Sequence, residues 1–123
     1  MMSRISMIFA PALVLLSLGG CTEDPAKIPA KELVQSGCNS DDDCPGGTCV
    51  AGIGEGLCTA DCSAQADCPE GTICTDTEAA NGVCLLACTN SSECSDHLGS
   101  AYNCDTESSF DEDRDVRVCI DGA

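Results

Sequence analysis

The sequence predicts a small disulfide-rich fold of tandem short β-hairpin units, with little helix and a disordered amino-terminal tether. Three observations predict it: thirteen cysteines occur in 123 residues, their spacing repeats, and large apolar side chains are scarce. Residues 38–119 contain twelve large apolar or aromatic residues, the same number as the cysteines in that range. A core of ordinary size cannot be built from that supply, so cross-links must provide much of the stability.

Residues 1–20 have the pattern of a secretory signal peptide that is removed. One positive charge, Arg4, stands in a short leading region, and an apolar run follows from Ile5 to Leu18. That run is too short to span a bilayer comfortably as a mature helix, and it suits the apolar region of an export signal. We therefore expect the protein to be exported.

The end of this run, Leu18-Gly19-Gly20-Cys21, resembles a bacterial lipobox. The resemblance implies that Cys21 receives a diacylglyceryl group, that the signal is cut before Cys21, and that the new amino terminus is acylated with a fatty acid such as palmitate. Two or three acyl chains anchor a protein stably where one is marginal. By analogy with enteric lipoproteins, Thr22 after the anchor favours the outer membrane. An ordinary signal peptide with a coincidental cysteine is the alternative.

The number of cysteines supports lipidation independently. Thirteen is odd, and an odd cysteine in an exported protein needs an explanation. If Cys21 is the lipid site, the remaining twelve can all form disulfide bonds.

Residues 21–37 are predicted to be the anchor cysteine and a flexible spacer. Pro25 and Pro29 interrupt regular structure, and residues 22–37 contain no cysteine. Residues 30–36 could form two helical turns, but an isolated helix that short is marginal. Fully extended, the spacer could hold the cysteine-rich region up to about 50 Å from the lipid. The alternative is that this segment packs on the first repeat.

The cysteine-rich region divides into three units: residues 38–60, 61–86 and 87–123. Five residues separate the first and second cysteines in every unit, and three residues separate the fourth cysteine of one unit from the first of the next. Such self-similarity indicates an array of equivalent units. The cysteines of the successive units are Cys38, Cys44, Cys49 and Cys58; Cys62, Cys68, Cys74 and Cys84; and Cys88, Cys94, Cys104 and Cys119.

If pairing stays within a unit, three patterns are open. The local sequence favours first-to-third and second-to-fourth, because the third and fourth cysteines lie on two short strands that read as a hairpin. The expected strands cover residues 48–51 and 57–59, then 72–75 and 83–85 with Asn81-Gly82 as a turn signal, then 101–105 and 115–120. The predicted bonds are Cys38–Cys49, Cys44–Cys58, Cys62–Cys74, Cys68–Cys84, Cys88–Cys104 and Cys94–Cys119.

The first two units share the motif Cys-Pro-x-Gly-Thr. Pro45 and Pro69 fix φ where the chain turns, and Gly47 and Gly71 can supply a positive φ before the next strand. The third unit has Cys94-Ser-Asp-His-Leu-Gly instead. We therefore expect it to be divergent, either as a looser terminal unit or as a unit adapted for binding.

The charge excludes several kinds of partner. All 21 acidic residues but only four of the five basic residues follow residue 20, which leaves a formal net charge of −17 from Cys21 onward. Nucleic acid is not expected as a partner, because phosphates need Lys and Arg. Electrostatic docking on anionic lipid is not expected either, so membrane contact is assigned to the covalent lipid.

Metal binding and catalysis are not expected, and no cofactor is predicted. The cysteine spacings do not match zinc sites, and His97 is the only histidine. The segment Asp111–Asp115 opens like an EF-hand loop, but Val116 and Gly122 occupy the positions that need Gly and Glu. Weak calcium binding by this segment or by Asp41–Asp43 remains an alternative. No serine lies in a nucleophile-elbow frame, so an enzyme is not expected.

As a whole, the sequence resembles cysteine-rich surface lipoproteins of gram-negative bacteria, on its lipobox, spacer and repeats. The five-residue cysteine spacing is also similar to that of small disulfide modules of extracellular animal proteins, such as the amino-terminal region of Dickkopf. We expect a non-enzymatic protein, lipid-anchored in the bacterial cell envelope at the outer membrane, that presents an acidic module for adhesion, recognition or envelope structure. The expected partner is an extracellular or periplasmic protein or glycan. The alternative is an inhibitor or ligand-binding module that inserts Gly52–Gly56 or Thr106–Arg114 into its partner.

Overall fold

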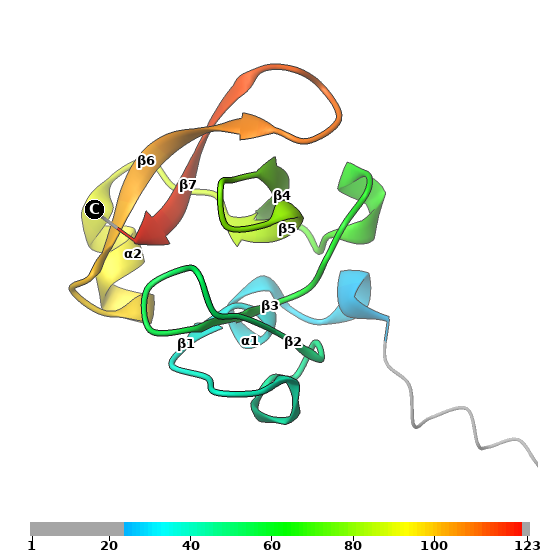
Figure 1. Cartoon of the computed structure of the whole chain (residues 1–123). Coiled ribbons are helices and arrows are strands. Elements are labelled where there is room, and N and C mark those ends of the chain that lie inside the picture. The colour runs from blue at the N-terminus through cyan, green and yellow to red at the C-terminus, as the bar shows by residue number, and fades with distance from the viewer. Residues whose placement is uncertain (1–23, 122–123) are drawn as a thin grey trace, which may run out of the picture.

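The computed structural model describes residues 24–121 as two small antiparallel sheets with little helix (Figure 1). The predicted signal peptide and Cys21 lie outside the described residues. The helical elements are short: η2 (Pro25–Lys27), α1 (Ala30–Leu33), η3 (Asp41–Asp43), η4 (Gln65–Asp67) and α2 (Ser91–Leu98). The strands are β1 (Gln35–Ser36), β2 (Thr48–Val50), β3 (Leu57–Thr59), β4 (Thr72–Asp76), β5 (Asn81–Leu86), β6 (Tyr102–Ser109) and β7 (Asp115–Asp121). The predicted disulfide-rich class of tandem β-hairpin units is confirmed.

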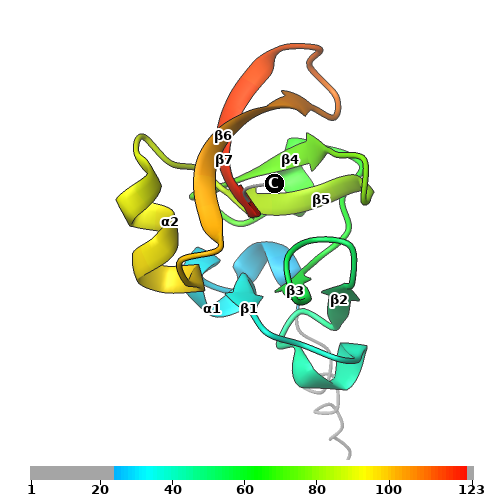
Figure 2. The same cartoon turned by 60° about the vertical axis from the view of Figure 1, so that its left-hand side comes forward.

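The three hairpins β2–β3, β4–β5 and β6–β7 correspond to the three repeats, but they do not remain separate. The first hairpin forms a three-stranded sheet, β1-β3-β2, with a strand from the amino-terminal segment. The second and third form one four-stranded sheet, β5-β4-β6-β7. Thr75 and Asp76 of β4 pair with Ser109 and Ser108 of β6, which joins the two hairpins. Figures 1 and 2 show the smaller sheet stacked against the larger one.

The predicted turn at Asn81-Gly82 is wrong. Both residues belong to β5, and Asn81 pairs with Asp76. The turn is formed by residues 77–80, where the Thr77 hydroxyl accepts hydrogen bonds from the backbone N–H groups of Ala79 and Ala80. Gly82 has φ of +92°, and a Cβ there would collide with the Cys62 carbonyl oxygen. The glycine therefore permits a close approach between strand and neighbouring chain rather than a hairpin turn.

One main hydrophobic core connects the three units and the amino-terminal segment. Its fully buried large residues are Leu33, Val34, Ile53, Leu57, Val83, Leu85 and Val118. Additional contacts join the first and second units: the Thr59 hydroxyl donates to the Cys84 carbonyl, and the Cys84 N–H donates to the Ala60 carbonyl at 3.0 Å. The scarce apolar residues are thus pooled in one shared core instead of being divided among three small ones.

The prediction of a flexible spacer is wrong from Asp24 onward. Residues 24–37 form η2, α1 and β1, and Leu33 and Val34 are fully buried. These apolar side chains gain more from burial in the shared core than a spacer would gain in chain entropy. The alternative prediction, that this segment packs on the first repeat, is correct, and the segment also contacts the third unit. Within residues 24–121, no helix has the length and apolar character needed to cross a membrane.

Candidate functional site

Six disulfide bonds dominate the described structure. They are Cys38–Cys49, Cys44–Cys58, Cys62–Cys74, Cys68–Cys84, Cys88–Cys104 and Cys94–Cys119. These are the first-to-third and second-to-fourth pairs that the local sequence favours. Eleven of the twelve cysteines are buried, and Cys49 is half-buried. The sulfur atoms are therefore stabilising cross-links with little access to solvent.

The bonds have the same geometry in each unit. The third and fourth cysteines stand directly opposite each other on the hairpin, in the pairs Cys49↔Cys58, Cys74↔Cys84 and Cys104↔Cys119. They do not bond to each other. Each bonds instead to a cysteine of the preceding helical loop, which is the segment from the first to the second cysteine of the unit. The two bonds therefore hold that loop against the hairpin.

A carboxylate directly before the second cysteine shapes this loop in all three units. Asp43 accepts hydrogen bonds from the N–H groups of residues 39 and 40 at 2.9 and 3.2 Å. Asp67 accepts from residues 63 and 64 at the same distances. Glu93 accepts from residues 89 and 90, and these backbone hydrogen bonds lower its pKa. Our sequence prediction missed these residues, although an acidic residue precedes the second cysteine in every unit.

A second repeated contact fixes the loop to the strand that carries the third cysteine. The third residue after the first cysteine accepts a hydrogen bond from the backbone N–H of the third cysteine. The acceptors are Asp41 for Cys49 at 2.8 Å, Gln65 for Cys74 at 3.1 Å, and Ser91 for Cys104 at 3.1 Å. Three different side chains perform one task, which is why sequence comparison between the units does not reveal it.

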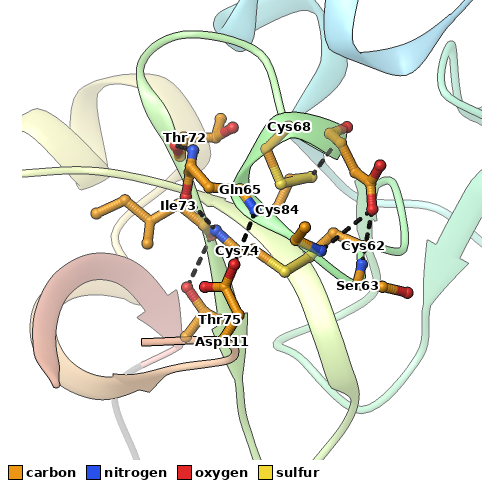
Figure 3. The surroundings of a disulfide bond; sticks show 12 residues. Cys62, Ser63, Gln65, Cys68, Thr72, Ile73, Cys74, Thr75, Cys84 and Asp111 are labelled. Atoms are coloured by element: carbon orange, nitrogen blue, oxygen red, sulfur yellow. Dashed lines mark hydrogen bonds between the residues drawn. A yellow bond between two sulfur atoms is a disulfide. The ribbon is translucent and has the colours of Figure 1, made fainter. Parts of the chain in front are cut away.

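Figure 3 shows this contact in the second unit. The Gln65 side chain accepts from the Cys74 N–H and donates to the Thr72 carbonyl at 2.8 Å, so its amide pairs with β4 much as a neighbouring strand would. The backbone N–H of Gln65 donates to Asp111 at 3.2 Å. Asp111 follows β6, so the third unit is tied to the helical loop of the second.

The third unit departs from the Cys-Pro-x-Gly-Thr turn by extending its loop into α2. Asn90 caps the helix, accepting from the Glu93 N–H at 3.1 Å, and Gly99 ends it with φ of +113°. In the first two units Gly47 and Gly71 adopt positive φ, as predicted. The predicted divergence of the third unit thus takes the form of a longer, regularly capped helix.

His97 lies on α2 and has a structural contact. Its Nε2 is 2.8 Å from the Val34 carbonyl oxygen, and no serine hydroxyl in the described part bonds to it. The ring borders an open pocket of about 480 Å³ together with Lys31, Glu93 and Asp96. Of these groups, His97 contacts the amino-terminal segment and Glu93 accepts from the backbone at the start of α2.

Several carboxylates of the segments considered for calcium are engaged with the protein itself. Asp41 and Asp43 accept backbone hydrogen bonds, and Glu112 forms an ion pair with Arg114 at 2.6 Å. Among residues 24–121, the groups of three or more potential metal ligands that approach one another consist of cysteines in disulfide bonds. A cysteine in a disulfide bond offers no thiolate.

The loop Gly52–Gly56 does not project as expected for an inserted loop. Ile53, its one large apolar residue, is only 1% exposed, and the Tyr102 hydroxyl donates to the Ile53 carbonyl at 3.4 Å. Burial, followed by the charges of Asp121 and Glu55, raises the pKa of Tyr102. The loop is therefore a lid on the third unit, and its apolar side chain cannot reach a partner.

The turn between β6 and β7 is the more exposed of the two candidate loops. Residues 106–109 belong to β6, so the turn itself covers residues 110–114. Phe110 is 39% exposed, the one exposed large hydrophobic residue of the described part, and acidic Asp111, Glu112 and Asp113 follow it. The Phe110 N–H donates to the Cys74 carbonyl at 2.9 Å, which fixes the base of the turn. An aromatic ring with an acidic rim is suited to contact with a protein surface.

A shallow acidic groove lies where the three units meet. It has a volume of about 260 Å³ and is lined by residues that include Ile53, Glu78, Glu107 and Asp121. Partial burial and the neighbouring carboxylates raise the pKa of Glu107.

Comparison with protein-family models, curated proteins and solved structures finds no match to this chain.

Proposed function

We propose that this chain is a lipid-anchored protein of a bacterial cell envelope that presents a disulfide-stapled acidic module for adhesion, recognition or envelope structure. One observation carries the proposal. Six disulfide bonds use the twelve cysteines between residues 38 and 119, and the thirteenth cysteine, Cys21, follows the lipobox-like Leu18-Gly19-Gly20. Lipidation accounts for both the odd number and the place of that cysteine.

The arrangement of the described residues supports a binding or structural role rather than catalysis. The lone histidine contacts a backbone carbonyl, and the repeated carboxylates bond to backbone N–H groups of the helical loops. The surface carries many exposed acidic side chains on a cross-linked frame. Such a frame loses little conformational entropy on binding, which favours recognition by a preformed surface.

The second candidate function is that of an inhibitor or ligand-binding module that uses the β6–β7 turn. The exposure of Phe110 and the acidic residues after it favour this reading. The partner would offer an apolar pocket with a basic rim. Replacing Phe110 with Ser should abolish binding to such a partner, and it should leave acylation of Cys21 unchanged.

The experiment that tests the main proposal is an intact-mass measurement. The protein is extracted from the membrane after free thiols have been blocked in the living cells. We expect a chain that begins at Cys21, carries acyl groups and has no blocked thiol. The Cys21→Ser variant is the matched control and should lack the acyl mass. An unacylated chain would contradict the anchor, and blocked thiols would contradict the cross-linked frame in the cell.

A further inference from the structure

We propose that the face of the module around η2 lies directly against the membrane surface that holds the acylated Cys21. This inference rests on the proposed function, because it requires a lipid on that cysteine. It goes beyond it by assigning an interaction surface and a partner, the lipid headgroup layer. The basis is the place in the chain where packed structure begins.

The chain is held from its first described turn. The Asp24 side chain accepts from the Ala26 N–H at 3.0 Å, and the Asp24 carbonyl accepts from the Lys27 N–H at 2.8 Å. The Pro25 carbonyl accepts from the Ile28 N–H at 3.1 Å, and the Ile28 side chain is buried in the main core. These contacts leave no free spacer after Asp24.

The rest of the segment is bound more firmly still. Leu33 and Val34 are fully buried, and the Val34 carbonyl bonds to His97. The Ser36 hydroxyl donates to the Leu98 carbonyl at 2.6 Å, while β1 pairs with β3. Releasing the segment would expose these apolar side chains to water and break a strand pairing.

The length of chain between the anchor and this segment is very short. Cys21 and Asp24 are three residues apart. A fully extended chain covers at most about 3.6 Å per residue, so η2 can lie no more than about 11 Å from the anchor. A spacer reaching to residue 37 would have permitted about 50 Å. The packed segment thus removes most of the distance that a flexible spacer would allow between the anchor and the folded module.

The distribution of charge favours the same orientation. Lys27 and Lys31, two of the four basic residues of the described part, are exposed on this segment, and so are Asp24 and Glu32, so the segment carries no formal net charge. The other two are engaged elsewhere: Arg114 pairs with Glu112, and Arg117 donates to backbone carbonyls of residues 89 and 104. Anionic headgroups repel this neutral segment less than they repel the acidic remainder.

This orientation places η2 nearer to the lipid than the larger sheet. In both views the β6–β7 turn lies at one end of the molecule, and η2 lies below the larger sheet, beside the smaller one (Figures 1 and 2). The exposed Phe110 and its acidic neighbours would therefore lie farther from the lipid than η2 does. The module then has a membrane side and a partner side.

The test uses the acylated protein in vesicles of phosphatidylethanolamine and phosphatidylglycerol, with an energy-acceptor dye on a small fraction of the headgroups. A fluorescent amino acid replaces Lys27 in one variant and Glu112 in another. A matched variant of each has a glycine–serine insertion of about sixteen residues between Glu23 and Asp24. We expect several-fold stronger quenching at position 27 than at position 112, and we expect the insertion to reduce that difference.

The mass of each vesicle-bound sample tests the lipid anchor independently of the orientation. Acylated protein with equal quenching at both positions would overturn the orientation and leave the lipid anchor intact. An insertion that leaves quenching at position 27 unchanged would do the same. A chain without acyl groups would overturn both the anchor and the orientation.

Discussion

The first unit and the fused second and third units use the same cysteine pattern but differ in what surrounds it. The first has strands of only three residues, and three of its cysteines form a separate small cluster beside the main core. In the fused pair, β6 and β7 have eight and seven residues, and all eight cysteines belong to the main core. An identical disulfide framework is thus part of the shared core in one region and stands beside that core in another.

The first unit is also incomplete by itself. Its sheet includes β1 of the amino-terminal segment, and Leu33 packs so close to Gly46 that a Cβ at that glycine would collide with the leucine. The segment therefore substitutes for the longer strands that the first unit lacks.

Removing one disulfide bond from each region should separate them most clearly. The double variant Cys94→Ala, Cys119→Ala opens a closure with a sequence separation of 25, and Cys38→Ala, Cys49→Ala opens one of 11. On the chain-entropy model these closures contribute about 3.5 and about 2.8 kcal/mol. The two buried sulfurs lost from the third unit add a cavity cost. We expect the first variant to have the lower guanidinium midpoint, and equal midpoints would contradict the contrast.

Replacing Leu33 with Ala tests whether the amino-terminal segment belongs to the folded unit. Leu33 is fully buried, so we expect a loss of about 3 kcal/mol in the free energy of unfolding. Lys31→Ala is the control on the same segment, because its exposed side chain should change stability by less than about 0.5 kcal/mol. Denaturant titration measures both, and two indistinguishable curves would mean that the segment is not part of the core.

The loop-capping carboxylate of the third unit should make stability depend on pH. Backbone hydrogen bonds lower the pKa of Glu93 from its ordinary value near 4.5. Its contribution to stability is therefore complete above that value and is lost as the pH falls through the lowered pKa of the folded state. We expect Glu93→Gln to be less stable than the natural chain at pH 7 and equally stable in acid. A constant difference across this range would rule out the carboxylate as the cause.

Glu107 should show the opposite behaviour with a smaller effect. Partial burial and the charges of Asp105, Glu78 and Asp121 raise its pKa, so the folded state disfavours its ionised form. Folding is therefore penalised at neutral pH, and the penalty disappears as the pH falls below the ordinary pKa of the side chain. We expect Glu107→Gln to raise the melting temperature slightly at pH 7 and not in acid. A decrease at pH 7 would show that the carboxylate has a favourable partner.

The sequence was sufficient for the features that depend on local spacing. The strands around Cys49 and Cys58, and the partners of all twelve cysteines, follow from residues close in the chain. The pairing of β4 with β6 could not be predicted, because it depends on Thr75 and Ser109, which are 34 residues apart and carry no distinctive pattern. The packing of Leu33 could not be predicted either, since a short apolar stretch after two prolines is compatible with a flexible spacer and with a packed segment.

The features of the candidate site also divide into those that the sequence reveals and those that depend on the fold. An acidic residue before each second cysteine was visible in the sequence, but its role depends on backbone N–H groups that only the folded loop brings together. The exposure of Phe110 depends on the length of β6, which extends four residues beyond the predicted strand. Positions of single side chains relative to distant elements were thus beyond the reach of spacing and composition.

The order of the disulfide bonds has a consequence for resistance to proteolysis. Within a unit the two bonded loops overlap, so one cleavage between its first and last cysteines leaves the two fragments covalently joined. Between Cys38 and Cys119, only the connectors at residues 59–61 and 85–87 lie outside every disulfide-closed loop. Thr59, Ala60, Leu85 and Leu86 are buried, and Asp61 and Ala87 form bridges to neighbouring strands. A protease could separate the units only by cutting these connectors, and the fold must first open there.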